Sequence, residues 1–146
     1  MIRPLLASAL AALLAGPVQA WTFTETDICR LTHAEDALAV DLSFDPAAGI
    51  YTITLTRPGM AWPDAPVFSL RFDGPRALQI STDRHVTGDE GRSLTVTDTG
   101  FGNVLDGIEF NTRMTALIGD QAISLSTDTA APAMQAFRAC PQPTTS

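Results

Sequence analysis

The stretch that decides the fold is ALAVDLSFDPAAGIYTITLTR, residues 37–57. Large apolar residues recur at every second position before and after a turn signal, DPAAG, at 45–49. Alternation with period two sends successive side chains to opposite faces of a β-strand. The stretch therefore predicts two antiparallel strands joined by a longer loop. The side chains expected on the inner face are Leu38, Val40, Leu42, Phe44, Tyr51, Ile53 and Leu55.

The same alternation continues along the chain. The segment TALIGDQAISL, residues 115–125, predicts a hairpin whose two-residue turn is Gly119-Asp120. Short strands at this spacing favour a mainly β fold, either an antiparallel sandwich or a small open barrel. The other predicted strands, separated by the turn signals DGP and TGDEG, are 68–72, 78–80 and 94–96.

Two segments change to helical spacing. Residues 103–110 predict a short helix, and a second helix is expected near 130–140 with Pro132 in its first turn. Phe137 and Cys140 would lie on the buried face of the second helix. The candidate N-caps of that helix are Thr127, Asp128 and Thr129.

The chain has two cysteines, Cys29 and Cys140, near opposite ends of the predicted domain. An isolated pair in an oxidising compartment usually forms one disulfide. The absence of C-x-x-C spacing argues against redox catalysis. We therefore expect a bridge that closes nearly the whole domain, with two free buried thiols as the alternative.

Residues 1–20, MIRPLLASALAALLAGPVQA, have the charge, the apolar core and the small-residue cleavage site of a secretory signal peptide. Their apolar core is short for a membrane span of about 20 residues. The sequence therefore predicts a periplasmic or secreted protein. One β-rich domain is expected at 21–140, followed by a disordered tail at 141–146.

The composition is strongly acidic: the chain has 9 arginines, no lysine and 16 acidic residues, for a formal net charge of −7. Nucleic acids and anionic membranes attract clustered cations. Neither is therefore an expected partner once the signal peptide is removed. No P-loop or zinc-ligand spacing is present, so the sequence predicts no cofactor and no metal.

The segment TDTGFGNVLDGIEF, residues 97–110, most resembles a working site. Its glycines do not match G-x-G-x-x-G, and a P-loop would need a lysine. We interpret it as a structural turn whose glycines supply unusual backbone angles. Calcium loops need more oxygen ligands at closer spacing. The side chains that could nevertheless hold a weak cation or a ligand are Asn103, Asp106 and Glu109.

The chain contains two histidines, and neither lies in an H-E-x-x-H or near a G-x-S-x-G motif. The weak catalytic candidates are His85 and Asp83. A hydrolase or metal-dependent site would require His85 in a concave site beside a carboxylate. The alternative is a surface or hydrogen-bonded histidine without a catalytic role.

The loop RPGMAWPDAP, residues 57–66, holds three prolines around Met60 and Trp62. Proline limits the freedom of a loop, so an aromatic side chain can be presented at a small entropic cost. Met60 and Trp62 are therefore the best candidates for contact with a peptide, a sugar or an apolar ligand. The alternative is that Trp62 folds back and fills one end of the β core.

Five stretches stand out together: YTITLTRPG, PVFSLRFDGP, TDRHV, LTVTDTGFGNVLDGIEFN and AFRAC. On these stretches the chain resembles a group of small exported proteins of alphaproteobacteria for which no activity is established. Some members of that group carry the label of an excinuclease ABC component. A chain with no P-loop, no lysine, an acidic charge and an export signal conflicts with DNA repair, so we treat the label as a naming error.

The sequence supports three hypotheses for function. The first is an exported, disulfide-closed β domain that binds an envelope protein or a small ligand. The second is a small hydrolase or metal-dependent enzyme that uses His85 with nearby carboxylates. The third is an inhibitor or immunity-like protein, which fits the acidic charge and the rigid proline loop and would form a tight, salt-sensitive complex with a basic partner.

Overall fold

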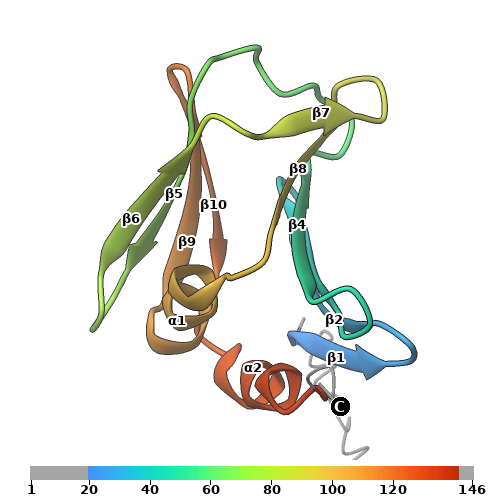
Figure 1. Cartoon of the computed structure of the whole chain (residues 1–146). Helices are drawn as coiled ribbons and strands as arrows, with labels where there is room; N and C mark the ends of the chain where they lie inside the picture. The colour runs from blue at the N-terminus through green and yellow to red at the C-terminus, as the bar shows by residue number, and fades with distance from the viewer. Residues whose placement is uncertain (1–19, 142–146) are drawn as a thin grey trace, which may run out of the picture.

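The computed structural model describes residues 20–141, and in that range ten strands form two antiparallel sheets (Figure 1). This confirms the predicted mainly β fold, and the sheets do not close into a barrel. The predicted signal peptide, apart from Ala20, lies outside the described residues. The predicted tail lies outside them as well, apart from Pro141.

The larger sheet has six strands and contains the hairpin predicted from the opening stretch. Leu42 lies opposite Ile53 in the register, so the apolar residues of both strands share the inner face. The six strands, in their order across the sheet, are β1 (Thr22–Glu25), β2 (Cys29–Ala34), β3 (Ala39–Asp45), β4 (Ile50–Thr56), β8 (Ser93–Asp98) and β7 (Val86–Gly88).

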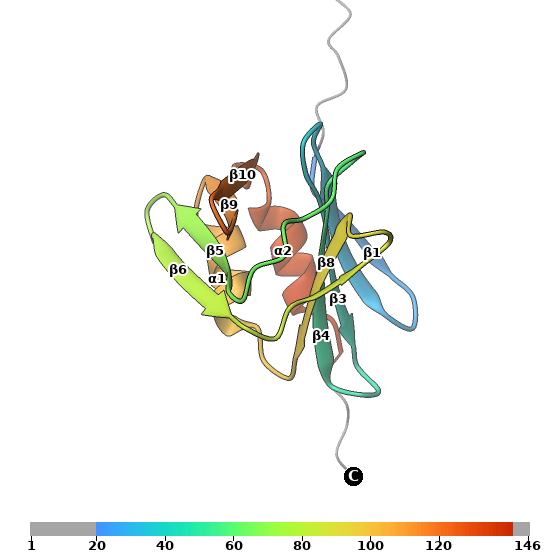
Figure 2. The same cartoon turned by 90° about the horizontal axis from the view of Figure 1, so that it is seen from above.

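The smaller sheet has four strands and faces the larger one (Figure 2). Gln121 lies opposite Ile118, which confirms the predicted two-residue turn at Gly119-Asp120. The four strands, in order, are β10 (Gln121–Ser126), β9 (Arg113–Ile118), β5 (Phe68–Asp73) and β6 (Leu78–Thr82).

Strands β1, β2 and β7 were not predicted from the sequence. The inner face of β2 carries Cys29, Leu31 and His33, and a histidine in that series hides the apolar alternation. His33 is buried because it stacks on Trp21, with ring centroids 4.8 Å apart, and its Nε2 lies 2.8 Å from the Glu35 carboxylate. β1 and β7 are short edge strands of 4 and 3 residues, too short for a periodic signal.

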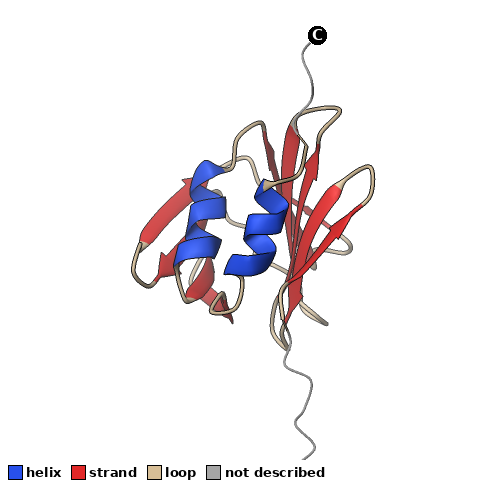
Figure 3. Ribbon diagram, turned by 90° about the horizontal axis from the view of Figure 1, so that it is seen from below, coloured by secondary structure: helices blue, strands red, loops and turns tan. Residues whose placement is uncertain are grey.

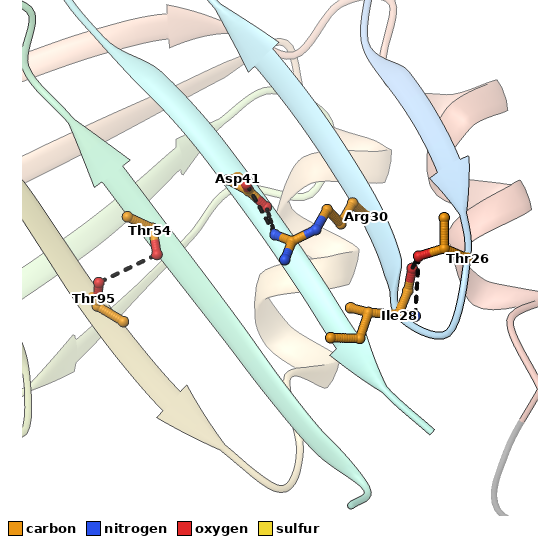
Figure 4. Close-up of polar contacts among 6 residues, drawn as sticks. All are labelled: Thr26, Ile28, Arg30, Asp41, Thr54 and Thr95. Atoms are coloured by element: carbon orange, nitrogen blue, oxygen red, sulfur yellow. Dashed lines mark hydrogen bonds and ion pairs between the residues drawn. The ribbon is translucent and has the colours of Figure 1, made fainter. Parts of the chain in front are cut away.

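The outer face of the larger sheet is polar and carries cross-strand pairs (Figure 4). Arg30 donates to both carboxylate oxygens of Asp41 at 3.1 Å, across β2 and β3. The hydroxyls of Thr54 and Thr95 lie 3.2 Å apart across β4 and β8. These pairs are half-exposed, so they set strand register more than they add stability.

Two helices, α1 (Gly102–Phe110) and α2 (Ala131–Arg138), lie side by side between the sheets at one end of the molecule (Figure 3). Both correspond to predicted helices. The predicted cap of the second helix was wrong: its N-cap is Ala130, which has no capping side chain. Thr127 does not cap the helix; its hydroxyl instead donates to the main-chain oxygen of Asn111 at 2.7 Å.

The disulfide Cys29–Cys140 is present, as predicted, and joins the start of β2 to the residues just after α2. Both cysteines are buried in the core. The bond therefore holds the C-terminal helix against the larger sheet.

A tight contact between α1 and the smaller sheet carries a first prediction. Gly107 packs against the ring of Phe72, and an added Cβ there would overlap the ring. We expect Gly107→Ala to lower the free energy of unfolding by about 1–3 kcal/mol, although alanine is the better helix former. Urea denaturation measures this. The matched control is Gly102→Ala in the same helix, where an added Cβ meets nothing within 4 Å and no loss is expected. Equal stability of the two variants would contradict the prediction.

Candidate functional site

A hollow of about 540 Å³ lies between the two sheets, beside the first turn of α1. We call it the inter-sheet groove. Its lining comes from β4 and β8 on one side, β5 and β6 on the other, and the segment that enters α1; these elements can be followed in Figure 1. The lining residues are Ile53, Phe68, Leu70, Ile80, Ser81, Thr82, Arg84, Val96, Asp98, Gly100, Phe101, Gly102, Asn103 and Val104.

The floor of the inter-sheet groove is apolar. Phe68 and Leu70 from β5 are buried beneath it, and Ile53 reaches it from β4. Ile80 and Val96 are only partly buried although both lie on inner strand faces. Partly exposed side chains on the inner faces mean that the two sheets do not pack fully against each other here. The volume falls within the range of about 300–1,000 Å³ that small-molecule sites occupy.

The rim of the groove is polar, and Arg84 and Asp98 are the charged residues of its lining. Arg84 follows β6, Asp98 ends β8, and their side chains pair at 3.2 Å. The other oxygen of Asp98 accepts from the main-chain N–H of Thr99 at 2.7 Å. The pair therefore joins the segment between β6 and β7 to the end of β8 at the mouth of the groove. The Arg84 side chain is 71% exposed, so it can move away from the mouth with little cost.

The glycine-rich segment lies on this mouth, but its glycines do not play the predicted role. Neither Gly100 nor Gly102 has a positive φ, so the expectation of unusual backbone angles was wrong for them. An added Cβ at either position would meet nothing within 4 Å. Because glycine has no side chain, Gly100 and Gly102 leave the mouth of the groove open. Phe101 between them is buried and contributes its ring to the groove.

The structure separates the three polar side chains predicted on the first helix. Asn103 lines the inter-sheet groove. Asp106 and Glu109 instead each accept a hydrogen bond of 2.6 Å from the guanidinium of Arg138 in α2. Partial burial lowers the pKa of Arg138, but the bonds to Asp106 and Glu109 outweigh this and raise it above the usual value for arginine. Both carboxylates therefore join the two helices.

The proline loop turns its tryptophan inward. Trp62 is 5% exposed, its Nε1 donates to the main-chain oxygen of Leu55 at 3.1 Å, and its ring contacts Phe68 edge-on. Arg57 lies over the same ring, 5.4 Å from its centroid. Met60, in contrast, is 54% exposed. The structure thus presents Met60 on the surface and places Trp62 in the core.

His85 has no carboxylate beside it among the described residues. Its Nε2 donates to the main-chain oxygen of Ala65 at 2.9 Å, and its Nδ1 is buried without a partner. Asp83 is exposed and makes no hydrogen bond to the histidine. In residues 20–141 no three His, Cys, Asp or Glu side chains come close enough to hold a metal ion.

Sequence reasoning missed most of the groove. Of the predicted binding residues, only Asn103 lines it; Arg84, Asp98 and the apolar floor were not singled out. Asp98 and Phe101 belong to the segment that most resembled a working site. Gly100 before the helix and Gly102 at its first position need no special backbone angle, and this would have been a usable signal, but the angles become known only from the structure.

Comparison with known proteins gives no relative: no protein-family model, no curated protein and no solved structure matches the chain. Within residues 20–141, no helix has the length and apolar character needed to cross a membrane.

Proposed function

We propose that the chain is an exported, disulfide-closed β domain that binds a small, largely apolar molecule in the inter-sheet groove. The observation that carries this proposal is the groove itself: a hollow of about 540 Å³ with an apolar floor and a polar rim. Small-molecule sites combine these features, with the apolar lining supplying affinity and a few polar groups fixing orientation.

Export is supported by two independent features. The first 20 residues have the pattern of a secretory signal peptide. The disulfide Cys29–Cys140 belongs to a class of bond that persists in oxidising compartments and is rare in the cytosol. A periplasmic or secreted location follows as part of the proposal.

A small ligand has more support than the other hypotheses. The enzyme hypothesis needed a carboxylate beside His85, and the contact of its Nε2 is a main-chain oxygen. The inhibitor hypothesis relied on a rigid proline loop, whose tryptophan is buried. An envelope protein would need an extended complementary surface, whereas the groove is a local concave site.

The test uses N-phenyl-1-naphthylamine, an uncharged apolar probe whose fluorescence rises in apolar sites. We expect the oxidised domain, residues 21–146, to bind it, and Gly102→Trp to weaken binding at least about tenfold, because an indole at the mouth would occupy the space of the ligand. Ala122→Trp, an exposed position on β10 outside the groove, is the control and should bind like the parent domain.

Thermal unfolding of both variants separates blockage from misfolding. An added Cβ at Gly102 meets nothing within 4 Å, so its melting temperature should stay within a few degrees of the parent. Unchanged probe affinity in a folded Gly102→Trp domain would rule out the inter-sheet groove as the binding site. No binding to the parent domain would reject the proposed function itself.

A further inference from the structure

We propose that the ligand of the inter-sheet groove is an amphiphile with an apolar body and one carboxylate, and that Arg84 binds this carboxylate at the mouth. The inference rests on the proposed function and specifies its substrate class. Three features of the mouth support it: the exposed Arg84, the fixed Asp98 and the N-terminal end of α1.

The lining has an apolar floor and a polar mouth, and the charged residues of the mouth form one ion pair. The floor consists of aliphatic and aromatic side chains, so the body of a ligand seated there gains from leaving water. Arg84 and Asp98 lie at the rim. A ligand with an apolar body and a single charged end would place that end beside this pair.

Arg84 is the partner that is free to exchange. Its guanidinium is bonded to Asp98 at 3.2 Å, and its side chain is 71% exposed. Such exposed pairs contribute little net stability. Asp98 is held independently, because its second oxygen accepts from the Thr99 N–H at 2.7 Å. When Arg84 moves to a ligand carboxylate, Asp98 keeps this bond, and one exposed ion pair replaces another.

The sign of the preferred charge is set by Arg84 together with its surroundings. A guanidinium can bind a carboxylate through two parallel N–H groups. The first residues of α1 line the same mouth, and among residues 20–141 no side chain forms a capping hydrogen bond at this end of the helix. This end of a helix carries partial positive charge and adds to the preference for an anion at the mouth.

The experiment measures displacement of N-phenyl-1-naphthylamine by three probes of equal chain length: dodecanoate, dodecanol and dodecylamine. The proteins are the oxidised domain, Arg84→Gln, Asp98→Asn and Arg71→Gln. Arg71 pairs with Asp73 at 3.2 Å on the smaller sheet, outside the groove, and is the matched control for loss of an exposed arginine.

We expect the parent domain to prefer dodecanoate over dodecanol by about five- to tenfold, and Arg84→Gln to remove that preference without changing dodecanol affinity. Asp98→Asn should strengthen dodecanoate binding about two- to threefold, because it removes the competing carboxylate. Arg71→Gln should behave like the parent.

The outcomes separate this inference from the proposed function. If the probe binds but the ratio of dodecanoate to dodecanol is the same in the parent and Arg84→Gln, the groove binds ligands and the role of Arg84 is refuted. Preference for dodecylamine would also refute it, because Asp98 would then be the receptor. Failure of the parent to bind the probe or any of the three compounds would reject the proposed function.

Discussion

Replacement of both cysteines, Cys29→Ala with Cys140→Ala, is expected to lower the free energy of unfolding by about 4–5 kcal/mol. The bond links residues 111 apart, so it restricts almost the whole domain in the unfolded state. Its loss frees that chain, and the entropic stabilisation of a loop this long is close to the largest a single bridge provides. Urea denaturation at 25 °C measures the difference.

Two controls identify the cause of the loss. Both cysteines are buried, so alanine also removes two sulfur atoms from the core. Chemical reduction of the natural chain keeps those atoms and breaks only the bond. We expect reduction to reproduce most of the loss. A loss below about 1 kcal/mol in both cases would show that α2 stays attached without the bridge and that the unfolded chain is already restricted.

Trp62→Ala is expected to destabilise the domain by about 3–5 kcal/mol, the range for removing a large aromatic side chain from a core. The side chain is 5% exposed, packs edge-on against Phe68 and donates to the main-chain oxygen of Leu55. Its removal leaves a cavity at one end of the β core and an acceptor without its indole donor. Urea denaturation again provides the measurement.

The matched controls lie in the same loop and at the same position. Met60→Ala alters an exposed side chain and should cost less than about 1 kcal/mol. Trp62→Phe keeps a ring but loses the indole N–H, so its loss should be intermediate. If Trp62→Ala unfolds at the same urea concentration as the natural chain, the indole does not contribute to the core. The loop at 57–66 would then again be a candidate for binding a partner.

The position of the helices explains why a groove is left between the sheets. α1 packs near β9 and α2 packs near β1 and β2, so both fill one end of the space between the sheets. Arg138 joins them through Asp106 and Glu109. Ile80 of β6 and Val96 of β8 line the inter-sheet groove and are only partly buried, because no helix of the described part of the chain fills the space between them.

Local patterns predicted much of the fold. The period-two alternation over 37–57 predicted β3 and β4 with the observed inner face, because the pleat alone decides which side chains share a side. The Gly119-Asp120 turn predicted the β9–β10 hairpin. The disulfide followed from a pair of cysteines in a chain with a predicted export signal. β1 and β7 were not predicted, because a strand of three or four residues contains too few alternating positions to give a periodic signal.

The sequence by itself determined seven of the ten strands in residues 20–141, the two helices and the cysteine pair, since each of these depends on residues that are neighbours in the chain or on their chemistry alone. Only the tertiary structure decided where a ligand could enter. It turned Trp62 inward, bound Asp106 and Glu109 to Arg138, and placed Arg84, between β6 and β7, against Asp98 at the end of β8. These contacts join segments that no local pattern relates, and they depend on how two separate sheets and a helix end meet in space.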